Sequence, residues 1–281
     1  MNELNESIPE SLALHIPSVT VNGETWRPDA SIYLGEIAVA ACRAGNQPPE
    51  SALPLAQVDQ LLNVGYLTME TGWARMSDGQ LYVAALTPMP NVTGEMIDWW
   101  FAWHATGNAY LLWHPRDHIE ARWKNAPNRS LPWKQQYIGN TSEIIEYVGS
   151  NKEYLNVWFK PPETYFDVSR FESADIATAI CSRGGQRREN IWTAHVIHLV
   201  RNTERGVEMR SRFWLGDLDA SPKGLVGKLL TPFMNSPAAR RRNIPDELGR
   251  ALMLHCAEEM HHLAGILPEL YKRFGPGATS Q

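Results

Sequence analysis

The order of apolar and polar residues predicts a run of strands followed by one long helix. Short runs rich in β-branched and aromatic residues, separated by turn residues, fill the middle of the chain. We therefore expect strands at residues 72–87, 110–114, 141–148, 155–159, 177–182, 191–201 and 206–214. The turn-forming composition of residues 202–206 predicts that the last two of these strands pair antiparallel.

Helical spacing of apolar residues appears before, within and after this run of strands. The predicted helices are residues 31–44, 55–65, 93–105 and a long C-terminal helix. Thr93 is a suitable N-cap for the third of these helices. The C-terminal helix opens at Pro245, has acidic residues in its first turn, and should end near Phe274, where a Gly-Pro-Gly sequence follows.

Antiparallel strands closed by one long helix predict an α+β fold, in which a curved sheet grips the helix and leaves a cavity between them. The 281 residues suffice for one large domain with a small N-terminal extension. We divide the chain into an N-terminal region of mixed helices and strands, residues 1–88, and a domain containing the sheet and the long helix, residues 89–281.

The C-terminal helix carries the first candidate chemistry. His255 and Glu259 lie in the same stripe as Leu252 and Ile266, because residues four apart on a helix differ by only about 40°. An ionised carboxylate on a core-facing stripe needs a compensating charge. A divalent metal ion provides one, and His and Glu at i and i+4 suit two of its ligands. The alternatives are a helix register shifted by one residue and a glutamate that reaches past the stripe to an arginine.

Composition narrows the class of protein. The formal net charge is −5, and residues 240–242 form the only dense basic run, which argues against nucleic-acid binding. The three cysteines lack a Cys-x-x-Cys spacing, as is typical of reduced thiols. The chain has no apolar run long enough to cross a membrane, and its start lacks the basic segment of a signal peptide. We expect a soluble, cytoplasmic protein without a nucleic-acid or membrane partner.

Tryptophan is abundant, with eleven residues, and it clusters at positions 99, 100, 103, 113, 123 and 133. Aromatic walls suit a pocket for a flat or apolar ligand, although an ordinary core would use the same residues.

Two histidines, four residues apart, lie at the end of the predicted strand 110–114 and just after it. His114 and His118 are separated by Pro115, which disfavours a continuous helix through the pair, so the two side chains should diverge. We expect one of them to enter the cavity while the other packs or forms hydrogen bonds. The alternative is that both are ordinary turn residues.

Alternation along two strands orients the remaining candidates. Glu146 shares a face with the apolar residues Ile144 and Val148, which favours it over Glu143 as a buried carboxylate. On the strand 191–201, His195 and His198 face opposite sides, so one of the two must point inward.

Five segments follow one another in the order and approximate spacing of a known family. They are WWFAWH at 99–104, WHPRDH at 113–118, EYVG at 146–149, RSRFWLG at 210–216 and HCAEE at 255–259. Together they resemble the family of diacetylphloroglucinol hydrolase and phloretin hydrolase. The resemblance covers about residues 85–270 and is much weaker over the first 80 residues.

The resemblance implies a helix-grip, START-like domain that binds one zinc ion (Zn²⁺) through two histidines and two glutamates. Matched position by position, it assigns the zinc to His118, Glu146, His255 and Glu259. His114, Glu143 and His262 are the rivals of His118, Glu146 and His255.

The resemblance also implies a reaction. The expected activity is zinc-dependent hydrolysis of the carbon–carbon bond between an acyl group and a phenolic, phloroglucinol-like ring or a related 1,3-diketone equivalent, with release of a carboxylic acid. His198 is the candidate for handling protons at the reaction centre, with His195 as the alternative. Tyr110 would donate a hydrogen bond to a substrate oxygen.

Two positions depart from the pattern of the phloroglucinol enzyme. Ala121 stands where that enzyme has an asparagine, and Phe213 stands where it has a tyrosine. With Tyr110 and His114, they are our candidate substrate-binding positions. Losing two polar anchors leaves phenolic hydroxyls without partners, so we expect the chemistry to be kept and the substrate to differ.

The expected partner is a small aromatic ketone, and the resemblance is compatible with a homodimer. Two other functions stay open at this stage. One is a zinc-dependent lyase or cyclase of a biosynthetic pathway on the same fold. The other is a non-catalytic protein that binds a hydrophobic ligand.

Overall fold

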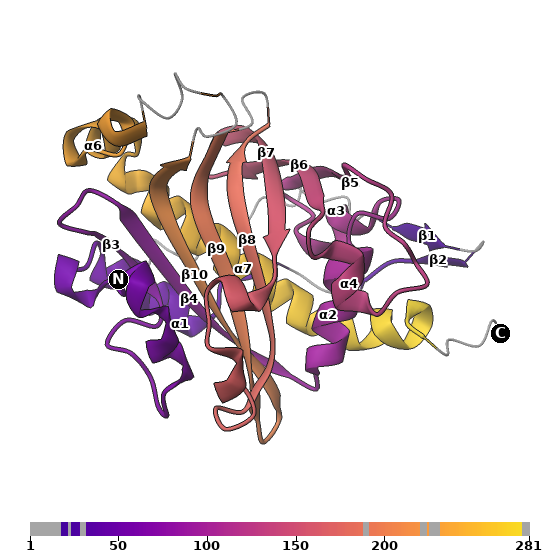
Figure 1. Cartoon of the computed structure of the whole chain (residues 1–281). Coiled ribbons are helices and arrows are strands. Elements are labelled where there is room, and N and C mark those ends of the chain that lie inside the picture. The colour runs from indigo at the N-terminus through magenta and orange to yellow at the C-terminus, as the bar shows by residue number, and fades with distance from the viewer. Residues whose placement is uncertain are drawn as a thin grey trace, which may run out of the picture.

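The computed structural model describes residues 18–276 except 22–23, 29–31, 188–190, 220–223 and 225–230. In this part of the chain, one antiparallel sheet of eight strands has the order β3-β4-β10-β9-β8-β7-β6-β5 (Figure 1). Its strands are β3 Gly72–Arg75, β4 Leu81–Pro90, β5 His118–Trp123, β6 Thr141–Val148, β7 Asn151–Lys160, β8 Ile176–Gln186, β9 Ile191–Thr203 and β10 Gly206–Asp219. A separate hairpin joins β1 (Val19–Val21) to β2 (Glu24–Trp26).

The helices surround this sheet. They are α1 Glu36–Ala44, α2 Gly94–Trp103, α3 Ala109–Trp113, α4 Trp133–Tyr137, α6 Pro237–Asn243 and α7 Asp246–Phe274. Shorter 3-10 helices are η2 Pro49–Ser51, η3 Leu55–Leu62, η4 Pro162–Thr164 and η5 Val168–Arg170. None of the helices in the described part of the chain combines the length and the hydrophobicity needed to span a bilayer.

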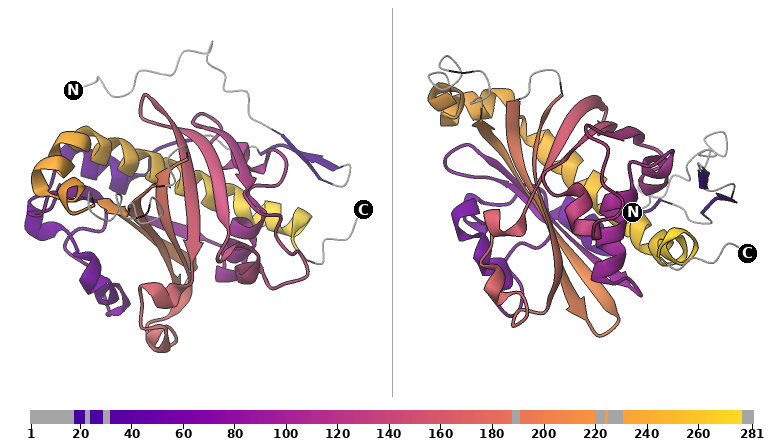
Figure 2. Two further views of the ribbon diagram at one scale, coloured as in Figure 1. Left: turned by 45° about the horizontal axis from the view of Figure 1, so that its top comes forward. Right: turned by 45° about the vertical axis from the view of Figure 1, so that its right-hand side comes forward.

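The long helix α7 lies across one face of the sheet, and α2 lies beside it (Figures 1 and 2). The approach of α7 to β3 is close at Gly249, where an added Cβ would lie 2.8 Å from the ring of Trp73. Only glycine permits this spacing, because real Cβ atoms do not approach other heavy atoms so closely. The helix is therefore fixed against the sheet close to its N-terminal end.

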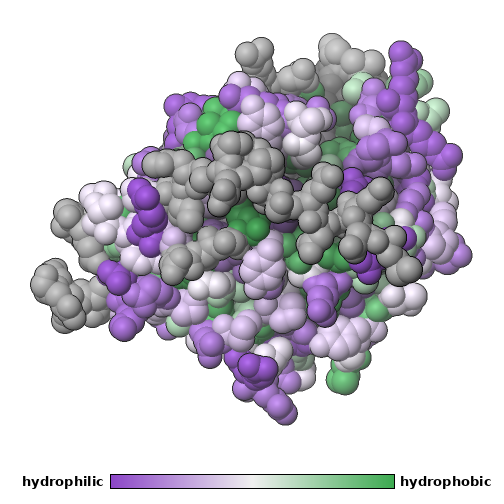
Figure 3. All heavy atoms as spheres, turned by 180° about the vertical axis from the view of Figure 1, so that it is seen from behind, coloured by the Kyte–Doolittle hydropathy of each residue, from purple (hydrophilic) through white to green (hydrophobic). Residues whose placement is uncertain are grey.

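Alternation along the strands divides the apolar residues between two cores. Leu81, Val83 and Ala85 of β4 face α7 and join the larger core, whereas Tyr82 and Ala84 join a second core on the opposite face. The second core is covered by the segment that contains η3. On the face seen in Figure 3, hydrophilic residues surround smaller hydrophobic areas.

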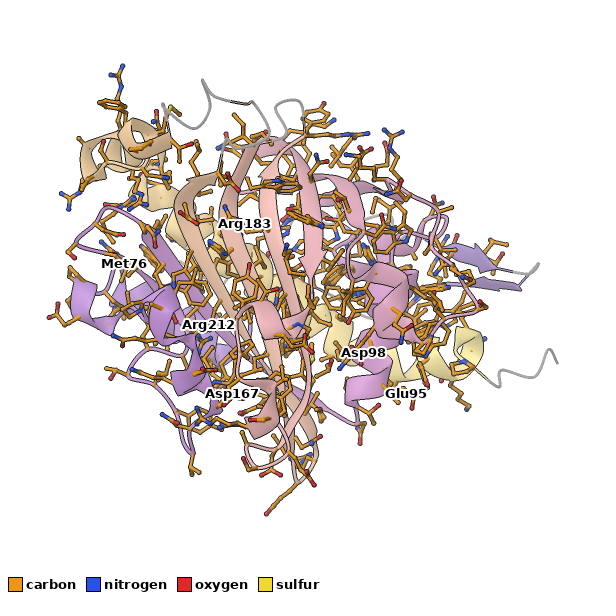
Figure 4. All side chains as sticks on the ribbon, viewed as in Figure 1. Met76, Glu95, Asp98, Asp167, Arg183 and Arg212 are labelled. Carbon is orange, nitrogen blue, oxygen red and sulfur yellow. The ribbon has the colours of Figure 1, made fainter. Side chains whose placement is uncertain are left out.

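A buried ion-pair network also ties the N-terminal segment to the second face. The carboxylate of Glu70 accepts hydrogen bonds from Arg210, at 3.0 Å from Nε, and from Arg212. Both arginines are almost completely buried, and Arg212 lies on the sheet face turned away from α7 (Figure 4). Glu70 therefore compensates two cationic groups that have little access to water.

The predicted α+β helix-grip fold is confirmed by this sheet and its long C-terminal helix. The predicted antiparallel hairpin is confirmed as well, since β9 and β10 pair from Thr203 and Gly206 onward. Thr93 caps α2 by accepting a hydrogen bond from the backbone N–H of Met96. β6 has the predicted bounds, and α7 ends at the predicted residue, Phe274.

Other expectations need correction. Residues 110–114 do not form a strand, because Ala109–Trp113 is the short helix α3, which ends before Pro115. β5, α4 and α6 were not predicted. β3 and β4 come from the predicted N-terminal region, so the sheet crosses the boundary set at residue 88. The first 17 residues of that region, and residue 31 of its first predicted helix, lie outside the described residues.

Candidate metal centre and active site

A cavity of about 270 Å³ lies between the sheet and α7. Its walls are mainly apolar and aromatic, and include Phe101, Trp113, Leu155, Val196, Leu248 and Leu252. A few polar side chains interrupt them, among them His104, Tyr110, Ser142, Glu146, His198 and Glu259. A mostly apolar enclosure with a small number of placed polar groups is typical of a small-molecule site.

The tryptophan cluster contributes only part of these walls. Trp113 lines the cavity. Trp99 and Trp103 stack on each other with ring centroids 4.8 Å apart, and Trp103 also stacks on Phe274 at 5.7 Å. These rings serve the core beside the cavity.

The predicted zinc ligands converge beside the cavity. His118, at the start of β5, lies opposite Glu146 of β6 in the sheet register. Nε2 of His118 is 3.7 Å from Oε2 of Glu146 and 3.4 Å from Oε2 of Glu259. Nε2 of His255 is 3.9 Å from the same oxygen of Glu259. All four side chains are buried, and the atoms of three of them, on His118, His255 and Glu259, lie within 4.8 Å of one another.

Hydrogen bonds orient both imidazoles of this group. Nδ1 of His118 lies 3.0 Å from the backbone carbonyl of Tyr110, which can only accept, so Nδ1 carries the proton. The lone pair of His118 is then on Nε2, a buried atom with no hydrogen-bond partner among the described residues. Nδ1 of His255 lies 3.4 Å from Oδ2 of Asp117, which leaves its Nε2 to face Glu259. Both rings therefore present a nitrogen to the same point.

The charges at this point are poorly compensated by the protein alone. Burial raises the pKa of Glu259 to about 8 and lowers the pKa of His118 well below its usual value. Burial also disfavours a charged His255, but the hydrogen bond to Asp117 and the charge of Glu259 outweigh it and raise the pKa of His255 to about 9. Two carboxylates and two imidazoles with an orphaned buried nitrogen fit a zinc ion, which would supply the missing positive charge.

A second group nearby has the composition of a metal site but a different chemistry. His114, Asp117 and His255 also offer atoms within 4.8 Å of one another. However, the Asp117 carboxylate already accepts two hydrogen bonds from Arg116, each of 2.9 Å. The backbone N–H of Asp117 donates to Nδ1 of His114, so the proton of that ring is on Nε2. An arginine thus supplies the positive charge here, and His114 offers no lone pair toward Asp117.

Tyr110 lies beside the metal ligands and also lines the cavity. Its ring stacks on His118 with centroids 3.9 Å apart, and its hydroxyl donates a hydrogen bond to Oε2 of Glu146. Burial and the charge of Glu146 raise the pKa of Tyr110 well above its usual value, so the phenol keeps its proton. The group can act only as a neutral hydrogen-bond donor or acceptor near pH 7.

The histidine pair of β9 divides as its alternation requires. His198 lines the cavity, and its Nδ1 lies 2.8 Å from the hydroxyl of Ser211. His195 lies on the other face, where Nε2 is 2.6 Å from Asp217 and 2.6 Å from Arg183, which Figure 4 labels. Burial lowers the pKa of His198 to about 4, so this ring is neutral near pH 7.

The other candidate positions are distributed differently. Phe213 lines the cavity beside His198, with ring centroids 5.9 Å apart. His114 and Ala121 are not among the residues that line it. His114 is fully buried and its Nε2 lies 3.3 Å from Glu258, while Ala121 packs in the core opposite Ile144. Neither therefore offers a group to a ligand in the cavity.

The other two residues that were alternatives to predicted ligands, Glu143 and His262, make other contacts. Glu143 pairs with Arg122 at 2.7 Å and with Arg187 at 3.0 Å, away from the metal ligands. Nδ1 of His262 lies 3.1 Å from the backbone carbonyl of Trp113. Neither contact involves His118, Glu146, His255 or Glu259.

The sequence did not predict a role at the site for three side chains, namely Asp117, His104 and Ser142, and His104 was expected only to cap or pack at a helix end. Asp117 contacts His255, and Nε2 of His104 lies 3.2 Å from the hydroxyl of Ser142 inside the cavity wall. The only sequence feature that could have indicated a role for Asp117 is its position within the WHPRDH segment. No sequence pattern pairs His104 with Ser142.

The chain is similar to known hydrolases over most of its length. The family model of the DAPG hydrolase PhiG domain matches residues 53–272. The phloretin hydrolase of Eubacterium ramulus is 31% identical over 247 residues, covering 83% of this chain and 83% of that protein. The 2,4-diacetylphloroglucinol hydrolase of Pseudomonas protegens is 25% identical over 267 residues, 90% of this chain and 86% of that protein.

One match among solved structures has low sequence identity. An aromatase/cyclase from Streptomyces sp. R1128 is 12% identical, with a TM-score of 0.36, over 71% of this chain and 99% of that chain. The family match and the two relatives cover most of the sequence, and the family match includes every predicted metal ligand. They confirm both the resemblance and the prediction of an enzyme: the chain belongs to the DAPG hydrolase family.

Proposed function

We propose that this protein is a zinc-dependent hydrolase that cleaves the carbon–carbon bond between an acyl group and a phloroglucinol-like ring. The observation that carries the proposal is the convergence of His118, Glu146, His255 and Glu259 on one point beside an apolar cavity. The relatives named phloretin hydrolase and 2,4-diacetylphloroglucinol hydrolase support acylated phloroglucinols as the substrate class.

When bound, zinc would polarise a carbonyl or enolate oxygen of the substrate and acidify a water molecule. Two glutamates offset its charge, so this ligand set suits orienting the substrate and water as much as strong Lewis acidity. The Asp117 carboxylate and the Tyr110 carbonyl hold the imidazoles of His255 and His118 in the orientation that such binding needs.

The reaction consumes one water molecule. The water oxygen becomes part of the released carboxylic acid, and the electron pair of the broken carbon–carbon bond goes to the ring carbon, which then takes a proton. His198 suits this proton transfer because it is neutral near pH 7 and lines the cavity. A neutral imidazole can accept a proton from water and then return one to the ring carbon.

Tyr110 supports the same reaction as a hydrogen-bond donor. Its hydroxyl donates to Glu146 and stays protonated because burial raises its pKa. Since Tyr110 also lines the cavity, the same proton can be redirected to an oxygen of a bound substrate. Aromatic and aliphatic walls meanwhile exclude bulk water, which strengthens these contacts.

The test is acid release from a series of acylated phloroglucinols that carry acetyl, longer alkyl and arylpropionyl groups. Zinc-loaded protein should release the carboxylic acid and the deacylated ring in equal amounts, measured by chromatography with mass spectrometry. Protein stripped with a chelator should be inactive and should recover when zinc is returned. No acid from any member of the series with zinc-loaded protein would contradict the proposal.

A further inference from the structure

We infer that the hydroxyl group of Ser142, held in place by His104, accepts a hydrogen bond from a ring hydroxyl of the substrate. The inference rests on the proposed function for the nature of the substrate and adds a specificity-determining residue to it. It assigns a polar anchor in a cavity where Phe213 provides none and which Ala121 does not line.

Ser142 and the metal centre share one strand. Ser142 lies on β6, on the same face as Ile144 and Glu146, and all three line the cavity. Ser142 is 1% exposed and its partner His104 is 2% exposed. A serine hydroxyl buried to this degree in an apolar wall needs a hydrogen-bond partner, and His104 provides one.

The direction of the hydrogen bond between the two residues follows from the partners of His104. Its Nδ1 lies 2.9 Å from the backbone carbonyl of Phe101, which can only accept, so Nδ1 carries the ring proton. Burial lowers the pKa of His104 to about 4, which keeps the ring neutral near pH 7. Nε2 therefore has a lone pair, and the Ser142 hydroxyl, 3.2 Å away, must donate to it.

This arrangement fixes the polarity of Ser142 toward the cavity. With its proton directed to His104, the oxygen of Ser142 has only lone pairs left to offer, and no other hydrogen bond to this side chain is present among the described residues. A ligand group that donates, such as a phenolic hydroxyl, matches it. An ether or carbonyl oxygen, which only accepts, does not.

The anchor also lies close to the metal ligands. The ring of His104 is 6.1 Å from that of Tyr110, which stacks on His118 at 3.9 Å. Ser182 is the other serine of the cavity wall, but no hydrogen bond fixes its hydroxyl among the described residues, so it carries no preference for a donor.

The experiment measures binding by calorimetry to the full-length, zinc-loaded protein. The ligands are a trihydroxyphenyl methyl ketone, analogues that each lack one ring hydroxyl, and the corresponding methoxy analogues. Wild-type protein should bind one of the deoxy analogues about tenfold more weakly than the parent compound, the usual effect of losing one neutral hydrogen bond. Ser142→Ala should bind the parent compound about tenfold more weakly and no longer distinguish it from that analogue.

Two further variants separate the hydroxyl from the packing of the side chain. The side chains introduced by Ser142→Thr and Ser142→Val have nearly the same shape, and both suit a strand. Only threonine keeps a hydroxyl, so only the threonine variant should keep the wild-type discrimination. His104→Phe frees the Ser142 proton, so affinity for the methoxy analogue should rise relative to the parent compound. Thermal unfolding of each variant checks that it is folded.

Retained discrimination in both Ser142→Ala and Ser142→Val would overturn the inference, as would equal loss of discrimination in Ser182→Ala. Wild-type protein that binds none of these ketones would overturn it as well. Because affinity and acid release are separate readouts, the outcome is distinguishable from that of the proposed function. If the wild type releases no acid and Ser142→Ala still loses the discrimination, only the proposed function is contradicted.

Discussion

Asp117 lies at the back of the His255 imidazole, with 3.4 Å between its Oδ2 and Nδ1 of His255. The same carboxylate is held by two hydrogen bonds of 2.9 Å from Arg116. Nε2 of His255 faces Glu259 at 3.9 Å. Asp117 thus fixes which nitrogen of His255 is available to a metal ion.

We predict that Asp117→Asn weakens zinc binding about 10- to 100-fold while one site per chain is kept, because partners of this kind orient and polarise metal-bound histidines. Competition with a chromogenic chelator measures the affinity. Glu120→Gln, an exposed acidic residue of β5, is the matched control and should bind zinc as the wild type does. Unchanged affinity in Asp117→Asn would show that His255 needs no such partner.

His198→Gln should reduce turnover of an acylphloroglucinol by about 10² to 10⁴, the usual range for loss of an acid–base group, with zinc content unchanged. His198 lines the cavity, and His195 lies on the opposite face with Asp217. His195→Gln therefore serves as the control and should retain turnover. The reverse result, with His195→Gln inactive and His198→Gln active, would show that His195 handles the protons and would contradict the role of His198.

Stability should decrease in mild acid because of buried neutral histidines. Burial lowers the pKa of His104 from 6.5 to about 4, so between these values the unfolded chain binds a proton that the folded chain does not. The contribution of His104 to the free energy of unfolding is then constant above pH 6.5 and falls by up to about 1.4 kcal/mol per pH unit below it. Urea unfolding of the zinc-free wild type and of His104→Gln at several pH values gives the slope of the free energy of unfolding against pH. Between pH 4 and 6.5, the slope of the variant should be smaller by the equivalent of about one bound proton. Identical slopes would mean that His104 is charged in the fold.

Glu70→Ala should destabilise the protein by about 3–5 kcal/mol, because it leaves the buried guanidinium groups of Arg210 and Arg212 without their counter-charge. Glu269→Ala removes an exposed pair with Arg273 and should cost less than about 0.5 kcal/mol. Urea denaturation measures both. A loss below 1 kcal/mol for Glu70→Ala would indicate that water or another group replaces its carboxylate.

The sequence predicted the fold wherever one strong local signal dominated. Richness in β-branched and aromatic residues predicted β6 with its observed bounds, and the Gly-Pro-Gly sequence predicted the end of α7 at Phe274. Residues 110–114 were assigned wrongly because a short apolar run has no period long enough to separate a helix from a strand. β5 was missed because a bulge between His118 and Glu120 interrupts its alternation.

The site was predictable only in part, for a related reason. Alternation placed Glu146 inward and separated His195 from His198, since both follow from strand geometry. The choice between His114 and His118 depends on which nitrogen carries the proton, and that is set by the carbonyl of Tyr110 and the backbone of Asp117. Contacts made only in the folded chain leave no periodic pattern in the sequence.

The most direct test of the account is the zinc content of the purified protein, measured by elemental mass spectrometry. We predict about one zinc per chain in the wild type, almost none in Glu259→Ala, and a full complement in Glu143→Ala, whose carboxylate pairs with Arg122 away from the metal ligands. A wild type that holds no zinc even after zinc is supplied, or a Glu259→Ala variant that keeps it, would contradict the proposed metal centre.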